Sequence, residues 1–186
     1  MPPKIKVCKE DILQAGVDIV RKEGADRLNA RAVAAALGCS TQPVFSNYAT
    51  MEELRIAVAE RAESISRDYI EQEVKTEQYP PYKASGMAYI RFAREEQELF
   101  KLLYMRDRTA EIIPQETALG NEMESLVHGN TGLEGTSLKL FHLEMWAYVH
   151  GIATMIATGY LNLSMELVSQ MLTDAYQGLK KHYEMR

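Results

Sequence analysis

The side chains best able to do chemistry in this 186-residue chain are its four histidines and two cysteines. His142 and His150 share one predicted helical face, but eight residues separate them by about 12 Å along a helix axis, too far to ligate one metal ion. Cys8 and Cys39 lack the paired spacing of a metal site and are typical of a reduced, cytoplasmic compartment. No glycine-rich phosphate loop, HExxH or GxSxG motif occurs. We therefore predict no enzyme, no bound metal and no cofactor.

A second group of polar side chains, within residues 29–48, has the spacing of a recognition surface. Asn29 can cap a first short helix, and Gly38 can adopt the left-handed backbone that ends a helix sharply. Ser40 or Thr41 can then cap a second helix. The pattern predicts a helix-turn-helix, whose second helix can enter a DNA major groove. The motif alone leaves open a purely structural helix pair.

Further helices are predicted on both sides of this motif. Apolar residues at helical spacing predict a helix from Lys9 to Glu23. Thr50 and Glu53 have the spacing of a capping box and open a long helix that we expect to reach Lys75. Beyond the helix-breaking pair Pro80 and Pro81, helices are predicted over 82–96 and 98–105. Another opens at Pro114 and continues through Leu119 and Leu126, and His128 to Gly135 is predicted as a loop.

The last fifty residues carry two long apolar periodicities, over 138–160 and 167–179. Both helices also have apolar or small residues on a second face, at Trp146, Ala153, Ala157, Val168 and Gly178. A helix that is apolar on two faces needs more than its own core to bury it. We therefore predict a homodimer through these two helices, with a buried hairpin of a monomer as the alternative.

Composition bounds the class of protein. Hydrophobic residues make up 46% of the chain, and no apolar stretch is long enough for a membrane span or a signal peptide. The net charge is −5, but residues 1–60 are neutral overall, with Lys4, Lys6 and Lys9 near their start. Charge therefore permits a local basic surface without itself indicating nucleic-acid binding.

Residues 12–54 resemble the TetR family of transcriptional regulators. The family pattern is an acidic residue and glycine at a helix end, then Thr-x-Arg-x-Ile-Ala, Leu-Gly-Val-Ser, Leu-Tyr-x-His-Phe and Lys-x-x-Leu. The matching residues here are Glu23, Gly24, Asn29, Arg31, Val33, Ala34, Leu37, Gly38, Cys39, Ser40, Val44, Phe45, Asn47, Tyr48, Met51 and Leu54. Trp146, His150 and Gly151 also resemble a C-terminal signature of some members. The resemblance implies an all-helical homodimer with a DNA-binding head and a ligand-binding, dimerising C-terminal domain.

The sequence departs from the family pattern at four positions that often contact phosphates. Asn29, Phe45, Asn47 and Met51 replace threonine, tyrosine, histidine and lysine, and each lost contact lowers the salt dependence of binding by roughly one unit. Base reading is expected from Thr41, Gln42 and Ser46, because glutamine can pair with adenine and hydroxyls can donate or accept. The predicted DNA-contacting residues are Lys6, Arg31, Ser40, Thr41, Gln42, Pro43, Ser46, Asn47 and Tyr48.

The C-terminal part contains side chains suited to an adaptable apolar pocket. Methionines and amphipathic aromatic residues fill such cavities well. The predicted effector-binding residues are Met87, Phe92, Tyr104, Met105, Met123, Trp146 and His150, with Tyr89 and Phe100 as further candidates. Trp146 and His150 lie one turn apart and can orient a ligand through their N–H groups. For each residue, ordinary core packing is the alternative.

These observations predict an all-α protein with a DNA-binding domain over 1–52 and a helical ligand-binding and dimerisation domain over 53–186. The expected function is a cytoplasmic transcriptional regulator, a repressor released from a palindromic double-stranded DNA operator by a small apolar or amphipathic effector. The alternative is a helical dimeric small-molecule-binding protein whose helix-turn-helix is structural.

Overall fold

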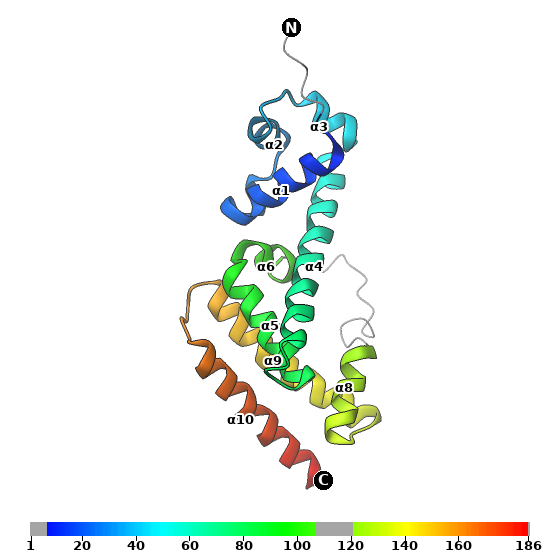
Figure 1. The fold of residues 1–186 in the computed structure, drawn as a ribbon, viewed down its shortest axis with the longest axis vertical. Helices are drawn as coiled ribbons and strands as arrows, with labels where there is room; N and C mark the ends of the chain where they lie inside the picture. Colours follow the sequence, from blue (N-terminus) through cyan, green and yellow to red (C-terminus); the bar gives the residue numbers. More distant parts are fainter. Residues whose placement is uncertain (1–6, 107–120, 186) are drawn as a thin grey trace. The chain divides into compact units, whose positions relative to one another are not determined.

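The computed structural model describes residues 7–106 and 121–185, and every regular element in those two ranges is helical (Figure 1). This confirms the predicted all-α fold class. The described chain divides into two compact units. Unit 1 comprises residues 7–66 and 96–106, and unit 2 comprises 67–95 and 121–185. These units are defined by packing, and the functional division at residue 52 stays a prediction.

The first helix of unit 1, α1 (Lys9–Glu23), has the predicted bounds. Its N-terminus is closed by a capping box in which the Cys8 Sγ accepts from the Asp11 N–H at 3.4 Å and the Asp11 carboxylate accepts from the Cys8 N–H at 2.8 Å. These hydrogen bonds to Cys8 lower the pKa of Asp11. Gly16 lets α1 approach its neighbour closely, since a Cβ there would lie 2.9 Å from the Val58 side chain.

The next segments of unit 1 are η1 (Ala25–Arg27), α2 (Ala30–Ala36) and α3 (Gln42–Asn47). The following helix, α4 (Met51–Lys75), begins in unit 1 and ends in unit 2 without interruption. The predicted capping box at its start is modified. The Thr50 hydroxyl accepts from the Glu53 N–H, but the Glu53 carboxylate reaches back to the N–H of Ala49 instead of Thr50.

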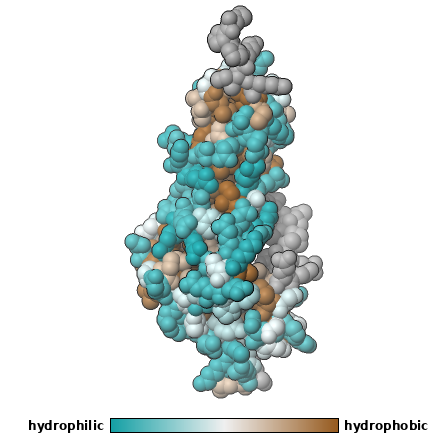
Figure 2. All heavy atoms as spheres, viewed as in Figure 1, coloured by the Kyte–Doolittle hydropathy of each residue, from teal (hydrophilic) through white to brown (hydrophobic). Residues whose placement is uncertain are grey.

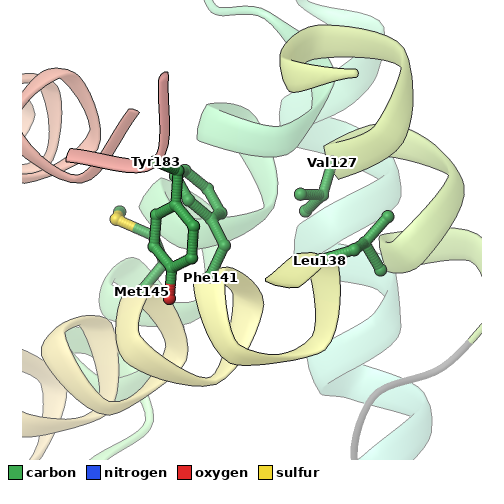
Figure 3. Packing of buried hydrophobic residues seen from close by; sticks show 5 residues of the cluster. All are labelled: Val127, Leu138, Phe141, Met145 and Tyr183. Carbon is green, nitrogen blue, oxygen red and sulfur yellow. The ribbon is translucent and has the colours of Figure 1, made fainter. Parts of the chain in front are cut away.

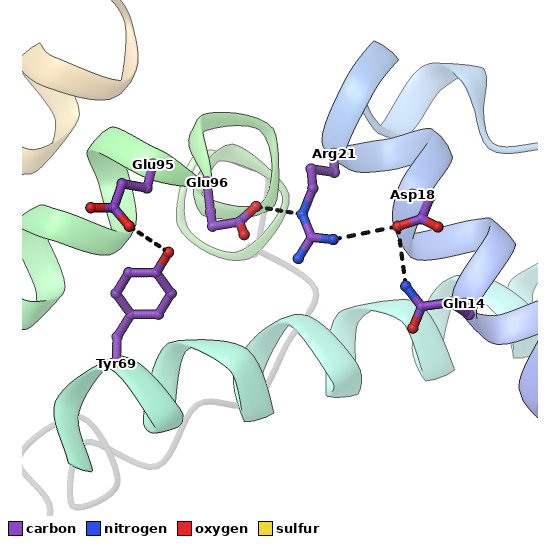
Figure 4. Close-up of polar contacts among 6 residues, drawn as sticks. All are labelled: Gln14, Asp18, Arg21, Tyr69, Glu95 and Glu96. Atoms are coloured by element: carbon purple, nitrogen blue, oxygen red, sulfur yellow. Dashed lines mark hydrogen bonds and ion pairs between the residues drawn. The ribbon is translucent and has the colours of Figure 1, made fainter. Parts of the chain in front are cut away.

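The last helix of unit 1 is α6 (Gln97–Tyr104), which packs on α1 despite the distance between them in sequence. Arg21 Nε donates to Glu96 at 2.7 Å, and the same guanidinium lies 3.4 Å from Asp18 (Figure 4). Leu99 and Phe100 of α6 are fully buried. Helix α6 follows the first helices of unit 2 in the sequence, yet its buried side chains complete the core of unit 1.

Unit 2 contains the end of α4 together with α5 (Pro81–Glu95), α8 (Asn121–Thr131), α9 (Gly135–Ala157) and α10 (Met165–Glu184). Helix α5 packs along α9 and also meets α8 and α10. At Gly86, an added Cβ would lie 3.4 Å from both Val149 and Leu172, so the absence of a side chain allows three helices to meet.

One cluster in the core of unit 2 joins α8, α9 and α10 (Figure 3). Its buried members are Val127, Leu138, Phe141, Met145 and Tyr183. The Phe141 ring meets Tyr176 and Tyr183 edge-on, at 5.5 and 5.8 Å between centroids. Such contacts add to the free energy gained from burying the rings.

The structure corrects one detail of the sequence prediction and leaves another untested. Helix α8 continues to Thr131, so only Gly132 to Glu134 remain of the loop predicted from His128 to Gly135. The Asn130 and Thr131 side chains donate to carbonyls four residues earlier, which satisfies them inside a helix. The predicted helix start at Pro114 and its continuation through Leu119 lie outside the described residues.

Candidate nucleic-acid interface and effector domain

The first half of the candidate DNA interface is α2, which local side-chain chemistry fixes as predicted. The Asn29 carboxamide oxygen accepts from the N–H groups of Arg31 and Ala32 at 3.1 and 3.0 Å. Val33 and Ala34 are buried, whereas Arg31 is exposed. The N-cap thus orients α2 so that its apolar face packs inward and its arginine points to solvent.

The turn between α2 and α3 is a Schellman motif built on Gly38. Gly38 has φ +63° and donates to the Ala35 carbonyl, and the Cys39 N–H donates to the Ala34 carbonyl at 3.0 Å. Glycine adopts this left-handed backbone without the steric penalty that a Cβ would bring. The turn therefore closes α2 and redirects the chain within a few residues.

Helix α3 begins with Thr41 at the N-cap, but the Thr41 side chain makes no capping hydrogen bond, contrary to the prediction. Val44 anchors the helix with 1% exposure, while Gln42 and Ser46 are exposed. The Ser46 hydroxyl donates to the Gln42 carbonyl, and its oxygen retains acceptor capacity. Gln42 and Ser46 thus form a polar outward face on an apolar base.

The remaining predicted contact residues fall into three groups. Ser40 is exposed, while Thr41, Pro43 and Asn47 are half-buried. The Asn47 side-chain amide donates to the Pro43 carbonyl at 2.9 Å. Lys6 lies outside the described residues.

Tyr48 has a different place from the one predicted. It is only 2% exposed, and Lys9 Nζ lies 4.7 Å from its ring centroid. Burial is the main cause that raises the Tyr48 pKa, and the carboxylates of Glu10 and Glu53 add to it. Tyr48 is a core residue of unit 1, and its burial removes it from the proposed DNA-contacting set. Phe45, in contrast, is 49% exposed.

The predicted effector-binding residues do not gather in one cluster. Met87 and Phe92 are buried in unit 2, and Met123 is half-buried on α8. Tyr104 and Met105 belong to unit 1, where the Tyr104 ring packs at 5.0 Å from Phe100. A site assembled from all seven side chains stays a prediction.

Two members of the predicted set do lie together, with Tyr89 as a third. The Trp146 indole stacks on the His150 imidazole with centroids 5.0 Å apart and an interplanar angle of 10°. The Tyr89 hydroxyl lies 2.9 Å from His150 Nδ1, and Thr154 lies 3.5 Å from Nε2. Burial lowers the pKa of His150, which favours the neutral imidazole.

A second tyrosine–histidine pair joins the same two helices, α5 and α9. The Tyr82 hydroxyl lies 2.9 Å from His142 Nδ1. Burial lowers the pKa of His142 against the opposing charge of Glu124, and burial raises the pKa of Tyr82. A neutral imidazole that accepts from the phenol satisfies both groups. Sequence reasoning missed this pair because its members are 60 residues apart and show no local pattern.

The predicted second apolar faces of α9 and α10 are partly wrong. Ala153, Ala157 and Val168 are buried within unit 2 itself, because the packing of α9 and α10 with α5 already covers them. The larger apolar side chains that stay exposed on these helices are Leu140, Leu143, Trp146, Tyr148 and Leu167. In the view of Figure 2, hydrophobic patches likewise interrupt a largely hydrophilic surface.

Comparison with protein families decides the classification. Residues 82–176 match the family described as tetracyclin repressor-like, C-terminal domain. The chain belongs to the TetR-like family. Its fold and C-terminal domain are those of a TetR-like transcriptional regulator, as the sequence resemblance implied. TetR-family regulators bind DNA and small-molecule ligands as dimers and are generally non-enzymatic.

Solved structures share the TetR-like fold at low sequence identity. A TetR-like transcriptional regulator from Rhodococcus sp. RHA1 superimposes with a TM-score of 0.70 at 16% identity, covering 96% of this chain and 98% of that one. A TetR-family member from Streptomyces coelicolor A3 gives 0.61 at 18% identity over 90% and 96%. The multidrug binding protein EbrR, complexed with malachite green, gives 0.58 at 16% over 93% and 98%.

Comparison with curated protein sequences gives no match. Among the described residues, no helix of this TetR-like chain is long and apolar enough to cross a bilayer. Within the same residues, no three or more His, Cys, Asp or Glu side chains lie close enough together to hold a metal ion.

Proposed function

We propose that the chain is a DNA-binding transcriptional repressor that a small apolar or amphipathic effector releases from a palindromic operator. The observation that carries this proposal is the exposed polar face of α3, held on buried Val44 by a Schellman turn and a capped α2. That geometry fits a recognition helix, which presents its polar residues to base edges. We propose a cytoplasmic location for such a regulator.

The proposed DNA contacts follow from the exposure of each side chain. Gln42 can form a bidentate pair with adenine, and Ser46 can donate to or accept from a base edge. Exposed Arg31 suits a phosphate contact, since its guanidinium carries a permanent charge. The full proposed set is Arg31, Ser40, Thr41, Gln42, Pro43, Ser46 and Asn47, together with Lys6.

A homodimer is the proposed binding form. Exposed Leu140 and Leu143 on α9 and Leu167 on α10 supply apolar surface that a second copy can cover. Two copies related by a two-fold axis place two recognition helices about 34 to 36 Å apart, the distance between successive major grooves. Sedimentation of the protein and of a Leu143→Glu variant tests the dimer, because a charge in that interface shifts the equilibrium toward monomer.

The effector is proposed to bind in unit 2. EbrR, a multidrug binding protein with the same fold, has been crystallised with imidazole and with malachite green, which supports an amphipathic ligand. The stacked Trp146 and His150 can contact a planar group, and the Tyr89 hydroxyl orients the imidazole. An effector that binds the DNA-free form more tightly than the DNA-bound form lowers operator occupancy. The size of the effect is set by the ratio of the two affinities.

Fluorescence anisotropy with duplexes from the DNA flanking the protein's own gene tests the DNA-binding function. We expect tighter binding than to random duplex at physiological salt. Gln42→Ala should weaken binding to the preferred sequence by about 1–3 kcal/mol. Gln14→Ala, which removes an exposed glutamine from α1, is the matched control and should leave affinity unchanged. Equal binding to specific and random duplexes would contradict the proposal and favour a structural helix-turn-helix.

A further inference from the structure

Unit 2 buries a carboxylate whose oxygens accept no hydrogen bond from any residue that the structure describes. This is Glu73, near the end of α4, whose side chain has 0% exposure. Arg91 of α5 forms an ion pair with it, with Nη1 2.6 Å from Oε2, but the geometry of this contact is not that of a hydrogen bond. A carboxylate can accept about four hydrogen bonds, so Glu73 retains unused acceptor capacity.

The two members of the ion pair differ in their access to water. The Arg91 side chain is 37% exposed and can become hydrated if it leaves, whereas Glu73 cannot. An ionised carboxylate buried without a counter-charge is strongly unfavourable. The cation is therefore the exchangeable member of the pair, and another positively charged group can take its place beside Glu73.

Aromatic side chains lie near the pair on both helices: Tyr69 is one helical turn before Glu73 on α4, and Phe92 directly follows Arg91 on α5. The Tyr69 ring of α4 meets the Phe92 ring of α5 edge-on, with centroids 5.6 Å apart. The Tyr69 hydroxyl donates to Glu95 at 2.8 Å, as Figure 4 shows. Aromatic faces attract cations and pack well against planar apolar groups. The surroundings of Glu73 thus suit a ligand that combines a cationic nitrogen with an aromatic body.

We propose that Glu73 recognises a cationic nitrogen of the effector, in an ammonium, amidinium or guanidinium group that takes the place of Arg91. The inference rests on the proposed function, in which unit 2 binds the effector, and it narrows the effector to a cation. An anionic ligand is disfavoured at this position, since it competes for Arg91 and leaves Glu73 buried without a counter-charge. A neutral ligand provides no charge to replace the guanidinium.

Three planar probes of nearly the same shape test the charge requirement. Benzamidinium is a cation with N–H donors, benzamide is neutral, and benzoate is an anion. Binding to the full-length protein can be followed by ligand-observed NMR and by the shift in melting temperature. We expect benzamidinium to bind and to raise the melting temperature, while benzamide and benzoate bind at least about tenfold more weakly. Equal binding of the three probes would overturn the inference.

Two variants with opposite expected effects separate recognition from a structural ion pair. Glu73→Gln should reduce benzamidinium binding at least about tenfold. Arg91→Ala should strengthen it, because the competing guanidinium is gone, and benzamidinium should raise the melting temperature of this variant more than that of the original protein. Glu71→Gln, which alters an exposed carboxylate on the same helix as Glu73, is the matched control and should bind as the original does. Loss of binding in Arg91→Ala would contradict the inference even if Glu73→Gln does not fold.

Parallel anisotropy measurements distinguish this inference from the proposed function. If the protein binds its operator but gives the same response to all three probes, the proposed function is supported and the cation site is contradicted. If the protein binds benzamidinium through Glu73 but shows no preference for operator DNA, the cation site is supported and the proposed function is contradicted.

Discussion

The ends of α1 and α2 in unit 1 and the contacts of α5 in unit 2 satisfy their polar groups in different ways. In unit 1, helix ends are closed by neighbours in the sequence, as Asn29 closes α2 and Cys8 closes α1. In unit 2, polar side chains meet across helices, as in the Tyr82–His142 pair and the contact between Lys83 and Thr173, which are 90 residues apart. A local contact can form in a short peptide, but a long-range contact needs the packed core. The contacts of α5 therefore depend more on tertiary packing than the caps of α1 and α2 do.

This comparison predicts that core truncation in unit 2 has the largest effect. Phe141→Ala removes a fully buried ring from the cluster of α8, α9 and α10, and we expect it to lower the free energy of unfolding by about 3–5 kcal/mol. Urea unfolding followed by circular dichroism measures the change. Phe45→Ala in unit 1 is the control, since an exposed ring should change stability by no more than about 0.5 kcal/mol. Similar losses in both variants would contradict the role of the buried Phe141 ring in the core of unit 2.

A second substitution removes one long-range hydrogen bond without changing the packing. Tyr82→Phe leaves the buried His142 Nδ1 without the phenol hydroxyl, and we expect a loss of about 1–3 kcal/mol. Tyr79→Phe, at a tyrosine whose hydroxyl accepts from the exposed Gln78 amide, should cost much less. An equal cost measured by the same urea unfolding would show that the buried pair contributes no more than a surface contact.

Loss of a local contact in unit 1 should have a smaller effect. Asn29→Ala removes the N-cap of α2, and the expected cost is about 1 kcal/mol. Asn29→Asp keeps the acceptor oxygen and should retain most of the stability. Native-state hydrogen exchange can locate the loss, which we expect in α2 and the turn at Gly38. Faster exchange in unit 2 alone would contradict the local character of this contact.

The smallest expected effect is a pH dependence of unit 2. Burial lowers the pKa values of His142 and His150, so the unfolded chain binds protons more readily than the folded chain below about pH 6.5. Stability should be highest above that pH and should fall as the pH drops through it. His150→Gln should reduce the slope. Unit 1 contains no histidine and should lack this dependence.

The sequence predicted unit 1 well because its signals act over a few residues. The cap at Asn29, the glycine turn at Gly38 and the apolar position of Val44 are each set by steric and hydrogen-bonding rules within one or two helical turns. The same rules gave α1 its bounds and carried the family resemblance. They did not place Tyr48, because an aromatic side chain with a hydroxyl suits a surface or a core and only its neighbours decide.

The tertiary structure decided the features that join distant segments. Helical periodicity placed Glu73 on α4 and Arg91 on α5, but only packing showed that the carboxylate is buried against the guanidinium. Packing likewise buried Ala153 and Val168 inside unit 2 and brought Tyr82 to His142. The physical reason is that a local pattern fixes which face of a helix is apolar, whereas the partner of that face depends on the arrangement of all the helices.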